Sequence, residues 1–285
     1  MNKKKFVILS LVLIAVVFVI IIKNRSEKPV IYENQNSEQY SKIDINMYKN
    51  GSDIFITPQE LHQRIVSNDI SSLVILDASH PKVYTKEHIP GALSIGFKGL
   101  SDTTGKPGDK EWGTILSKEK LTKKLGSLGI TNDKLVVAYS DIFKGPGACG
   151  RAVWQMKMAG LENVRLLYGG LEVWKRLGYE LSQEDSKPVP SNDLVLKDYD
   201  ESSRAKQKYI HESISNIKIV DVRSLKEYTG EDTSRGEARG GHIKGSKWLE
   251  WKNVLNEDTT VKSPQKIIDL MAGIGIKPGD DFVLY

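Results

Sequence analysis

Cys149 is the residue whose type most directly suggests chemistry, because it is the only thiol among 285 residues. It stands at the predicted start of a helix, two positions before Arg151, and both a helix amino terminus and a neighbouring cation lower the pKa of a thiol. A single cysteine excludes an internal disulfide framework and a zinc site made of cysteines. Cys149 is therefore one candidate nucleophile. The alternative interpretation is a small, half-buried residue where a loop joins a helix.

Other polar residues stand directly after apolar runs. Ser140 follows the run LVVAY, but no base is evident beside it, which argues against a nucleophilic hydroxyl. Asp221 and Arg223 stand at the end of the run IKIV, and we expect their charges to pair and to fix the loop there.

The segments that hold these residues alternate between helix and strand patterns. Thr57, Pro58 and Glu60 form a capping box with proline at the first helical position, which predicts a helix start. Short β-branched runs end at Asp77 and Tyr139. Continuous apolar strands that alternate with helices indicate an α/β fold, with a parallel sheet covered by helices on both faces.

The second half of the sequence repeats the first. Residues 117–139 align without a gap over 23 positions with residues 263–285, which places Tyr139 on Tyr285. Upstream, LDASHPKVYT pairs with VDVRSLKEYT, and EHIPGA pairs with GHIKGS after an insertion in the second copy. His88 and His242 occupy the same place in the last pair, which favours a structural role for both. This pattern predicts a tandem duplication.

The two copies differ after the aligned tyrosines. About forty residues with two more predicted helices and a strand follow Tyr139, whereas the sequence stops at Tyr285. Because a parallel sheet needs helices on both faces, we expect exposed apolar sheet surface in the second copy. We therefore expect the sequence to be a fragment of a chain about forty residues longer.

The amino terminus suggests a membrane anchor. Residues 6–22 are apolar except for Ser10, and a helix of that length spans about 25 Å, near the minimum for a bilayer. Three lysines precede it and no small-residue cleavage site follows, so we expect an uncleaved single-pass anchor in the cell membrane, with the soluble domains outside the cytoplasm. The predicted order is a basic head (1–5), the anchor (6–22), a polar tether (23–50), a first domain (51–183), a linker (184–195) and a second domain (196–285).

The overall composition is that of an ordinary globular protein. The sequence is 39% hydrophobic and 27% charged, with a net charge of +5. The lysines are scattered and are not interleaved with aromatic residues, so we expect no nucleic-acid partner.

These motifs resemble the rhodanese family. DVRSLKEY followed by ARGGHIKGS, together with HIPGALSI and YGGLEVW, is similar to that family's pattern, from about Ile54 to Tyr285. Two copies in one chain resemble the tandem thiosulfate and 3-mercaptopyruvate sulfurtransferases. The resemblance implies two tandem rhodanese-like domains, the second incomplete. It also implies a cysteine that takes a sulfane sulfur from a small anionic donor and passes it, as a persulfide, to a thiol or a cyanide-like acceptor. The resemblance implies that this cycle needs neither a metal nor an organic cofactor.

The resemblance also places the site. The family's cysteine directly follows the central strand, where curled backbone N–H groups stabilise its thiolate, so the nucleophile is expected directly after Tyr285. Ser140 is the equivalent in the first copy, and with Asp141 and Arg151 it fits the inactive first domain of the tandem enzymes. Cys149 lies ten positions from the strand tip, which favours the structural interpretation of that thiol.

The resemblance implies that Arg239 faces the active-site loop and holds the anionic donor, because a guanidinium suits sulfonate or carboxylate oxygens. The alternative is a solvent-exposed arginine in a polar insertion. Two other functions stay open. One is a non-catalytic, membrane-tethered binding or regulatory module, and the other is arsenate reduction or phosphatase chemistry on a longer loop. The 285 residues alone are expected to be inactive.

Overall fold

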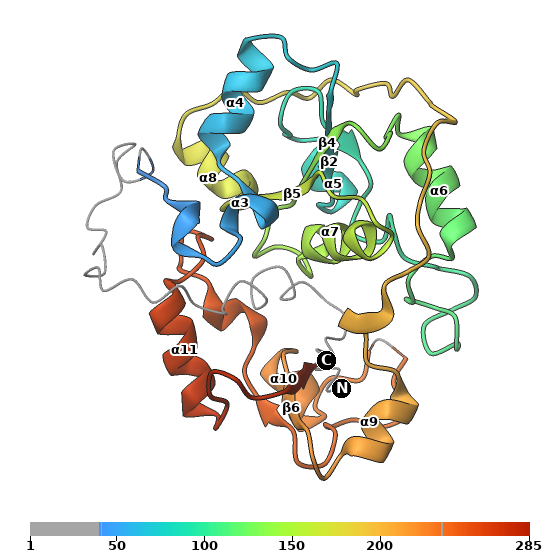
Figure 1. Cartoon of the computed structure of the whole chain (residues 1–285), viewed down its shortest axis with the longest axis vertical. Helices are drawn as coiled ribbons and strands as arrows, with labels where there is room; N and C mark the ends of the chain where they lie inside the picture. Colours follow the sequence, from blue (N-terminus) through green and yellow to red (C-terminus); the bar gives the residue numbers. More distant parts are fainter. Residues whose placement is uncertain (1–39, 41, 235) are drawn as a thin grey trace, which may run out of the picture.

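The computed structural model describes residues 40, 42–234 and 236–285, which contain two parallel sheets (Figure 1). Across the five-stranded sheet the order is β1 (Phe55–Ile56), β5 (Val164–Leu167), β4 (Leu135–Tyr139), β2 (Leu73–Asp77) and β3 (Leu93–Ser94). Across the three-stranded sheet the order is β7 (Lys247–Trp248), β6 (Lys218–Asp221) and β8 (Phe282–Leu284). Every strand pair is parallel, which confirms the predicted α/β class.

Helices accompany each sheet along the chain. Around the first sheet these are η2 (Ile45–Met47), α3 (Gly51–Ile54), α4 (Pro58–Val66), α5 (Pro81–Tyr84), α6 (Lys118–Ser127), α7 (Ala148–Met158) and α8 (Gly170–Arg176). Around the second they are η3 (Glu201–Ser203), α9 (Gln207–Ser213), α10 (Leu225–Thr229), η4 (Trp251–Val254) and α11 (Pro264–Gly273). We call η2 to α8 the first unit and η3 to β8 the second unit.

Local sequence fixes where several of these helices begin. Thr57 caps α4, and its hydroxyl oxygen accepts from the Glu60 N–H while the Glu60 carboxylate accepts from the Thr57 N–H. The predicted capping box is therefore present. Ser224 and Glu227 form the same reciprocal pair at the start of α10. Each box satisfies two of the donors that a helix start leaves free.

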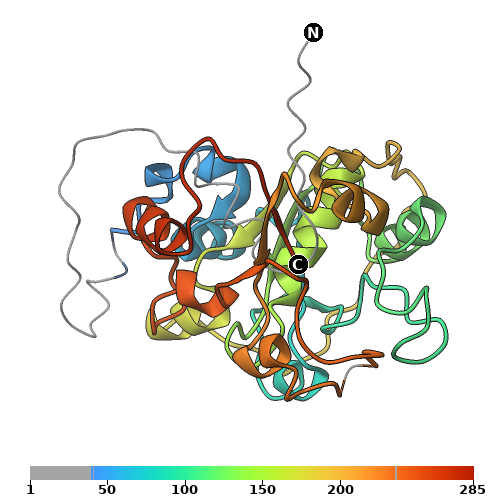
Figure 2. The same ribbon diagram turned by 90° about the horizontal axis from the view of Figure 1, so that it is seen from below.

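Helices cover both faces of the first sheet (Figures 1 and 2). On one face, Leu61 of α4 and Trp174 of α8 pack in a cluster with Ile75 and Val137. On the other face, residues of α6 and α7 such as Leu125 pack in a cluster with the alternate strand residues. Since successive strand residues point to opposite faces, this accounts for the continuous apolar runs in β2 and β4.

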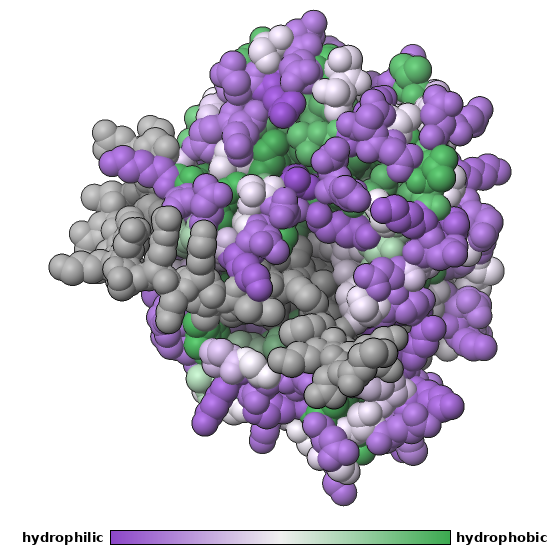
Figure 3. Space-filling model, viewed as in Figure 1, coloured by the Kyte–Doolittle hydropathy of each residue, from purple (hydrophilic) through white to green (hydrophobic). Residues whose placement is uncertain are grey.

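The second sheet is also buried, contrary to the exposed apolar surface that we expected. Ile219 and Val283 pack with Ile210 of α9, and Val220 and Leu284 join the cluster of the first unit's core. These four strand residues are at most 4% exposed. The face seen in Figure 3 is mostly hydrophilic, with hydrophobic side chains in small separate groups. The expectation was wrong because α9 covers one face, and the residues of the other face share their cluster with Ile267 and Met271 of α11 as well as with residues of the first unit.

The predicted cell-membrane location is contradicted. Among residues 40, 42–234 and 236–285, no helix is long and apolar enough to cross a bilayer. The longest described helix, α7, has 11 residues and is about 17 Å long, roughly half of what a span needs. The anchor predicted at residues 6–22, the basic head before it and most of the tether lie outside the described residues.

Tyr139 ends β4, the middle strand of the first sheet, and Tyr285 directly follows β8, an edge strand of the second sheet. The two tyrosines make the same contacts. The Tyr139 hydroxyl accepts from the Ile89 N–H at 2.9 Å, and the Tyr285 hydroxyl accepts from the Ile243 N–H at 2.8 Å. The tyrosine carbonyl oxygens accept from the main-chain N–H that follows the last residue of β2 or β6, at 2.8 Å and 2.9 Å. Each tyrosine thus ties its strand end to the turn that precedes β3 or β7.

We expect Tyr139→Phe to lower the free energy of unfolding by about 1–3 kcal/mol, because it leaves the buried Ile89 N–H without an acceptor. Tyr285→Phe is expected to cost less, since that tyrosine is only half-buried. Urea unfolding followed by tryptophan fluorescence measures both. Tyr209→Phe is the control, because its hydroxyl makes no hydrogen bond to the described residues. Equal losses for Tyr139→Phe and Tyr209→Phe would contradict the role given to this hydroxyl.

Candidate functional site

The polar residues singled out in the sequence gather at the carboxyl ends of the strands, where the loops of parallel sheets present side chains together. At the end of β4, Ser140 is buried and its Oγ lies 3.2 Å from the Sγ of Cys149, which is also buried. Cys149 stands in the first turn of α7, as predicted, but its side chain points into the core. Burial raises the pKa of the thiol, which outweighs the lowering effect of hydrogen bonds to it.

Asp141 and Arg151, the acid and the arginine of the expected inactive pattern, do not form an ion pair. The Asp141 carboxylate pairs with the Lys144 ammonium at 2.9 Å. The Arg151 side chain instead donates from Nη2 to the carbonyl oxygen of Gly113 at 2.5 Å. Burial lowers the pKa of Arg151 to about 10, and its buried Nε has no hydrogen-bond partner among the described residues.

Asp221 and Arg223 form a two-pronged ion pair at the end of β6. The Nη2 and Nε atoms of Arg223 lie 2.6 Å and 3.0 Å from the two carboxylate oxygens of Asp221, and Nη2 also donates to the carbonyl oxygen of Gly241 at 2.8 Å. The Arg223 guanidinium lies 5.2 Å from the centre of the Tyr285 ring. Hydrogen bonding to Asp221 raises the pKa of Arg223 further. The guanidinium of Arg223, paired with Asp221, therefore stands at the end of β6 and beside the Tyr285 ring.

Arg239 and His242 lie on the segment between α10 and β7. Arg239 is exposed, and the structure shows no hydrogen bond or ion pair for it among the described residues. His242 is exposed as well, but its Nδ1 lies 2.9 Å from the Tyr228 carbonyl oxygen and its ring stacks on that tyrosine. Tyr84 and His88 repeat this stacking in the first unit. Arg223, which sequence reasoning treated as structural, is thus an arginine that lies against the Tyr285 ring. The signal was its position two residues after a buried strand aspartate.

The first unit has a serine where the second has this arginine. Asp77, the equivalent of Asp221, is 0% exposed, and its Oδ1 accepts from the Ser79 N–H at 2.7 Å. Its Oδ2 is buried and has no hydrogen-bond partner among the described residues. Burial raises the pKa of the Asp77 carboxyl above its ordinary value of 3.8. The same aspartate is therefore balanced by a cation in one unit and unbalanced in the other.

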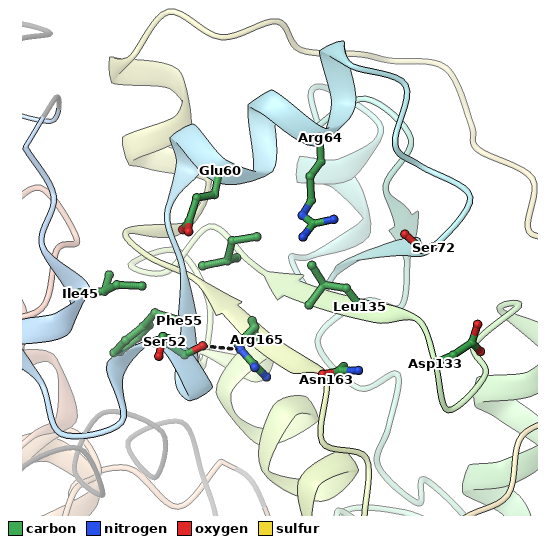
Figure 4. Close-up of a pocket in the computed structure, with 11 residues that line it drawn as sticks. Ile45, Ser52, Phe55, Glu60, Arg64, Ser72, Asp133, Leu135, Asn163 and Arg165 are labelled. Carbon is green, nitrogen blue, oxygen red and sulfur yellow. Dashed lines mark hydrogen bonds between the residues drawn. The ribbon is translucent and has the colours of Figure 1, made fainter.

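A pocket of about 400 Å³ lies at the opposite edge of the first sheet, where the strands begin (Figure 4). Arg64 of α4 and Arg165 of β5 point towards it. Both are already paired, Arg64 with Asp69 and Arg165 with the carbonyl oxygens of Ser52 and Glu162. None of the residues predicted for the site lines this pocket.

The chain is similar in sequence to a family model and to individual curated proteins. The family model of the rhodanese-like domain matches residues 57–177. A putative thiosulfate sulfurtransferase of Haloferax volcanii is 31% identical over 211 residues, which cover 72% of this chain and 70% of that protein. The sulfur carrier protein TtuD of Thermus thermophilus is 34% identical over 216 residues, which cover 71% of this chain and 72% of that protein.

A solved structure shares the fold. The anaerobic ergothioneine biosynthesis enzyme of Chlorobium limicola, in complex with trimethyl histidine, superposes with a TM-score of 0.68 at 23% identity. The match covers 82% of this chain and 60% of that chain, so the chain spans about 60% of the length of that enzyme. At this identity the likeness concerns the fold alone.

The difference between Asp77, which has no cationic partner among the described residues, and Asp221, which pairs with Arg223, can be tested by unfolding experiments. Because the pKa of Asp77 is raised in the folded state, the folded protein holds that proton more tightly than the unfolded chain does. The contribution of Asp77 to stability is thus fully present below its ordinary pKa, and it is lost as the pH rises through the folded-state pKa. We expect Asp77→Asn to remove this loss and to raise the free energy of unfolding at pH 8 by about 1 kcal/mol.

The matched variant is Asp221→Asn, which we expect to lower the free energy of unfolding at pH 8 by about 2 kcal/mol because it leaves Arg223 without its carboxylate. Urea unfolding of both variants at pH 5 and pH 8 measures the difference. Losses of equal size for Asp77→Asn and Asp221→Asn would show that the two aspartates are not in different electrostatic states.

Proposed function

Since this chain belongs to the rhodanese family, we propose that it is part of a sulfurtransferase that moves a sulfane sulfur from thiosulfate or 3-mercaptopyruvate to a thiol or a cyanide-like acceptor. The names of two similar proteins, a putative thiosulfate sulfurtransferase and a sulfur carrier protein, support sulfur transfer. The proposal needs no metal and no organic cofactor, because both steps are displacements at sulfur.

We place the two units as tandem copies, residues 51–183 and 196–285, and the reactive position directly after Tyr285. The matched hydrogen bonds of Tyr139 and Tyr285 carry this assignment, because they put Tyr285 in the place that Tyr139 has before Ser140. In any product of the gene that extends beyond Tyr285, the next residue takes the position of Ser140. A thiol there would stand at the tip of β8, beside the guanidinium of Arg223.

At that position a thiolate would transfer sulfur in two displacement steps. A thiolate attacks the outer sulfur of thiosulfate, a new S–S bond forms, and sulfite leaves with the electron pair of the broken S–S bond. The resulting persulfide then gives its terminal sulfur to the acceptor, which restores the thiolate. The Arg223 guanidinium, 5.2 Å from the centre of the Tyr285 ring, would stabilise the donor's negative charge; Arg239, exposed on the neighbouring segment, is the second arginine proposed to bind it.

One observation favours a second candidate, a non-catalytic rhodanese-like binding or regulatory module. The only thiol of the 285 residues, Cys149, is buried at the start of α7, and burial raises its pKa. The described residues thus contain no thiol that a donor can reach. A residue other than cysteine directly after Tyr285 would favour this module over the enzyme.

We expect Cys149→Ala to leave the thiosulfate-dependent formation of thiocyanate from cyanide unchanged, because a buried thiol with a raised pKa supplies little thiolate. The 285-residue chain itself is expected to give only the background rate. The measurement compares the chain with Cys149→Ala at pH 8, and Ser140→Ala serves as a structural control beside the thiol. Turnover by the chain that disappears in Cys149→Ala would overturn the assignment of the reactive position.

The codon after that of Tyr285 tests the assignment independently. A cysteine codon, together with thiocyanate formation by the product that includes it, is the expected result. Any other codon at that position would contradict a persulfide formed there.

A further inference from the structure

We infer that the first unit holds the donor-binding segment of the second unit in place through one main-chain contact, between the turn at residues 106–109 and Gly236. This inference rests on the proposed function, in which Arg239 binds the anionic donor. The turn and Gly236 are positioning elements, because they act through Arg239 and not on the donor itself. The contact gives the first unit a part in donor binding.

The turn at residues 106–109 has a sequence that fixes its shape. Proline at the second position and glycine at the third are the residues that a type II turn prefers, because the third residue needs a positive φ. Gly108 has a φ of +95°, and the Asp109 N–H donates to the Lys106 carbonyl oxygen at 3.0 Å. The Asp109 carboxylate also accepts from the Lys106 N–H at 2.9 Å. These two hydrogen bonds hold the central peptide of the turn, between Pro107 and Gly108, in one conformation.

Gly236 lies against this peptide so closely that a side chain has no room. A Cβ at Gly236 would lie 2.4 Å from the Pro107 carbonyl carbon and 2.5 Å from the Gly108 nitrogen. A Cβ at Gly108 would lie 2.7 Å from the Gly236 carbonyl oxygen. Since all of these are main-chain atoms, they cannot turn away as the end of a side chain can. The close approach of the two segments thus depends on glycine at both positions.

Arg239 stands between this contact and the ion pair at the end of β6. Two residues after it, the Gly241 carbonyl oxygen accepts from Nη2 of Arg223 at 2.8 Å. Three residues before it, Gly236 meets the first unit. The main chain around Arg239 is therefore held on both sides, and loss of the Gly236 contact would free one of them. Ordering a mobile segment on binding costs free energy, so a segment that is already held binds the donor more tightly.

The same tetrapeptide occurs a second time without the contact. Residues 277–280 read KPGD, as residues 106–109 do, and the N–H of the last residue again donates to the carbonyl oxygen of the first at 3.0 Å. Gly279 has a φ of +92°, but a Cβ there would have no described atom within 4 Å apart from its chain neighbours. The cost of alanine at a positive φ is thus common to both turns, whereas the contact with Gly236 belongs to the first alone. Gly279→Ala is therefore the matched control for Gly108→Ala.

Limited digestion of the 285-residue chain with trypsin, followed by mass spectrometry, tests the contact. We expect Gly108→Ala to speed cleavage after Arg239 about threefold or more, because a segment released from one attachment enters a protease site more readily. Gly279→Ala is expected to change that rate less than about 1.5-fold, because it strains the same kind of turn and breaks no contact. Equal rates for the two variants would overturn the inference.

Gly236→Ala breaks the same contact from the other side. Combined with Gly108→Ala, it is expected to add nothing to the cleavage rate, because the contact is already lost. Independent, multiplying effects of the two substitutions would show that the glycines do not act through one contact, which would overturn the inference. Thermal unfolding of each variant shows whether it is folded. If Gly108→Ala does not fold, Gly236→Ala carries the tests.

Isothermal titration of the same chain with sodium thiosulfate at low ionic strength tests the effect on donor binding. We expect Arg239→Gln to weaken binding about tenfold, Gly108→Ala to weaken it about threefold, and Gly279→Ala to leave it unchanged. In the Arg239→Gln background, Gly108→Ala is expected to have no further effect, because the residue that the contact positions is gone. A further loss in that double variant would overturn the inference, as would full affinity in Gly108→Ala.

In the gene product that extends beyond Tyr285, the inference and the proposed function can fail separately. Gly108→Ala is expected to raise the KM for thiosulfate about threefold and to change kcat less than about twofold, because it affects donor binding. Thiocyanate formation with a KM that responds to Arg239→Gln and not to Gly108→Ala would keep the enzyme and overturn the inference. A product that forms no thiocyanate, with a thiosulfate affinity that falls in both variants, would keep the inference and overturn the sulfurtransferase.

Discussion

The hydrogen bond accepted by a tyrosine hydroxyl, at the end of β4 in one sheet and of β8 in the other, is the interaction on which the carboxyl edge of each sheet depends. It accepts a main-chain N–H from the turn before the neighbouring edge strand, while the tyrosine carbonyl oxygen accepts from the chain that leaves β2 or β6. Three segments that are far apart in sequence are thereby held at one point. The bond in the first unit is buried, so losing it would leave a main-chain donor unsatisfied, whereas the bond in the second unit is only part-buried. Whatever follows the tyrosine starts from a fixed position, and that is the condition for a strand-tip site.

The two units share these main-chain contacts, and the electrostatic difference between their strand ends comes from one position, which is Ser79 in the first unit and Arg223 in the second. Arg223 neutralises the buried Asp221 and reaches the ring of the terminal tyrosine, whereas Ser79 leaves Asp77 with one buried oxygen unpaired. An anionic nucleophile or donor would meet a cation at the second strand tip and a raised-pKa carboxyl near the first. The two tips are therefore suited to different tasks, although their backbones are held in the same manner.

Local and repeated features could be predicted from the sequence, and features set by distant contacts could not. The capping box at Thr57 involves residues within one turn, so its pattern was sufficient. The start of α7 near Cys149 was equally local, but the sign of the thiol pKa shift was not, because burial by the core outweighs any effect of the helix terminus. Arg151 turns towards Gly113, 38 positions earlier, and no spacing rule could have directed it there rather than to Asp141. The burial of the second sheet likewise depends on contacts between residues distant in sequence, such as those of α9 and α11 with β6 and β8.

The buried arginines differ in the partners that their guanidinium groups have. A folded chain normally gives each buried guanidinium either a carboxylate or several carbonyl oxygens, as Arg223 and Arg165 show. Arg151 has one carbonyl oxygen and a neighbouring positive charge, so its burial lowers stability unless something else compensates for it. Such a local cost is typical of sites that are completed by a ligand.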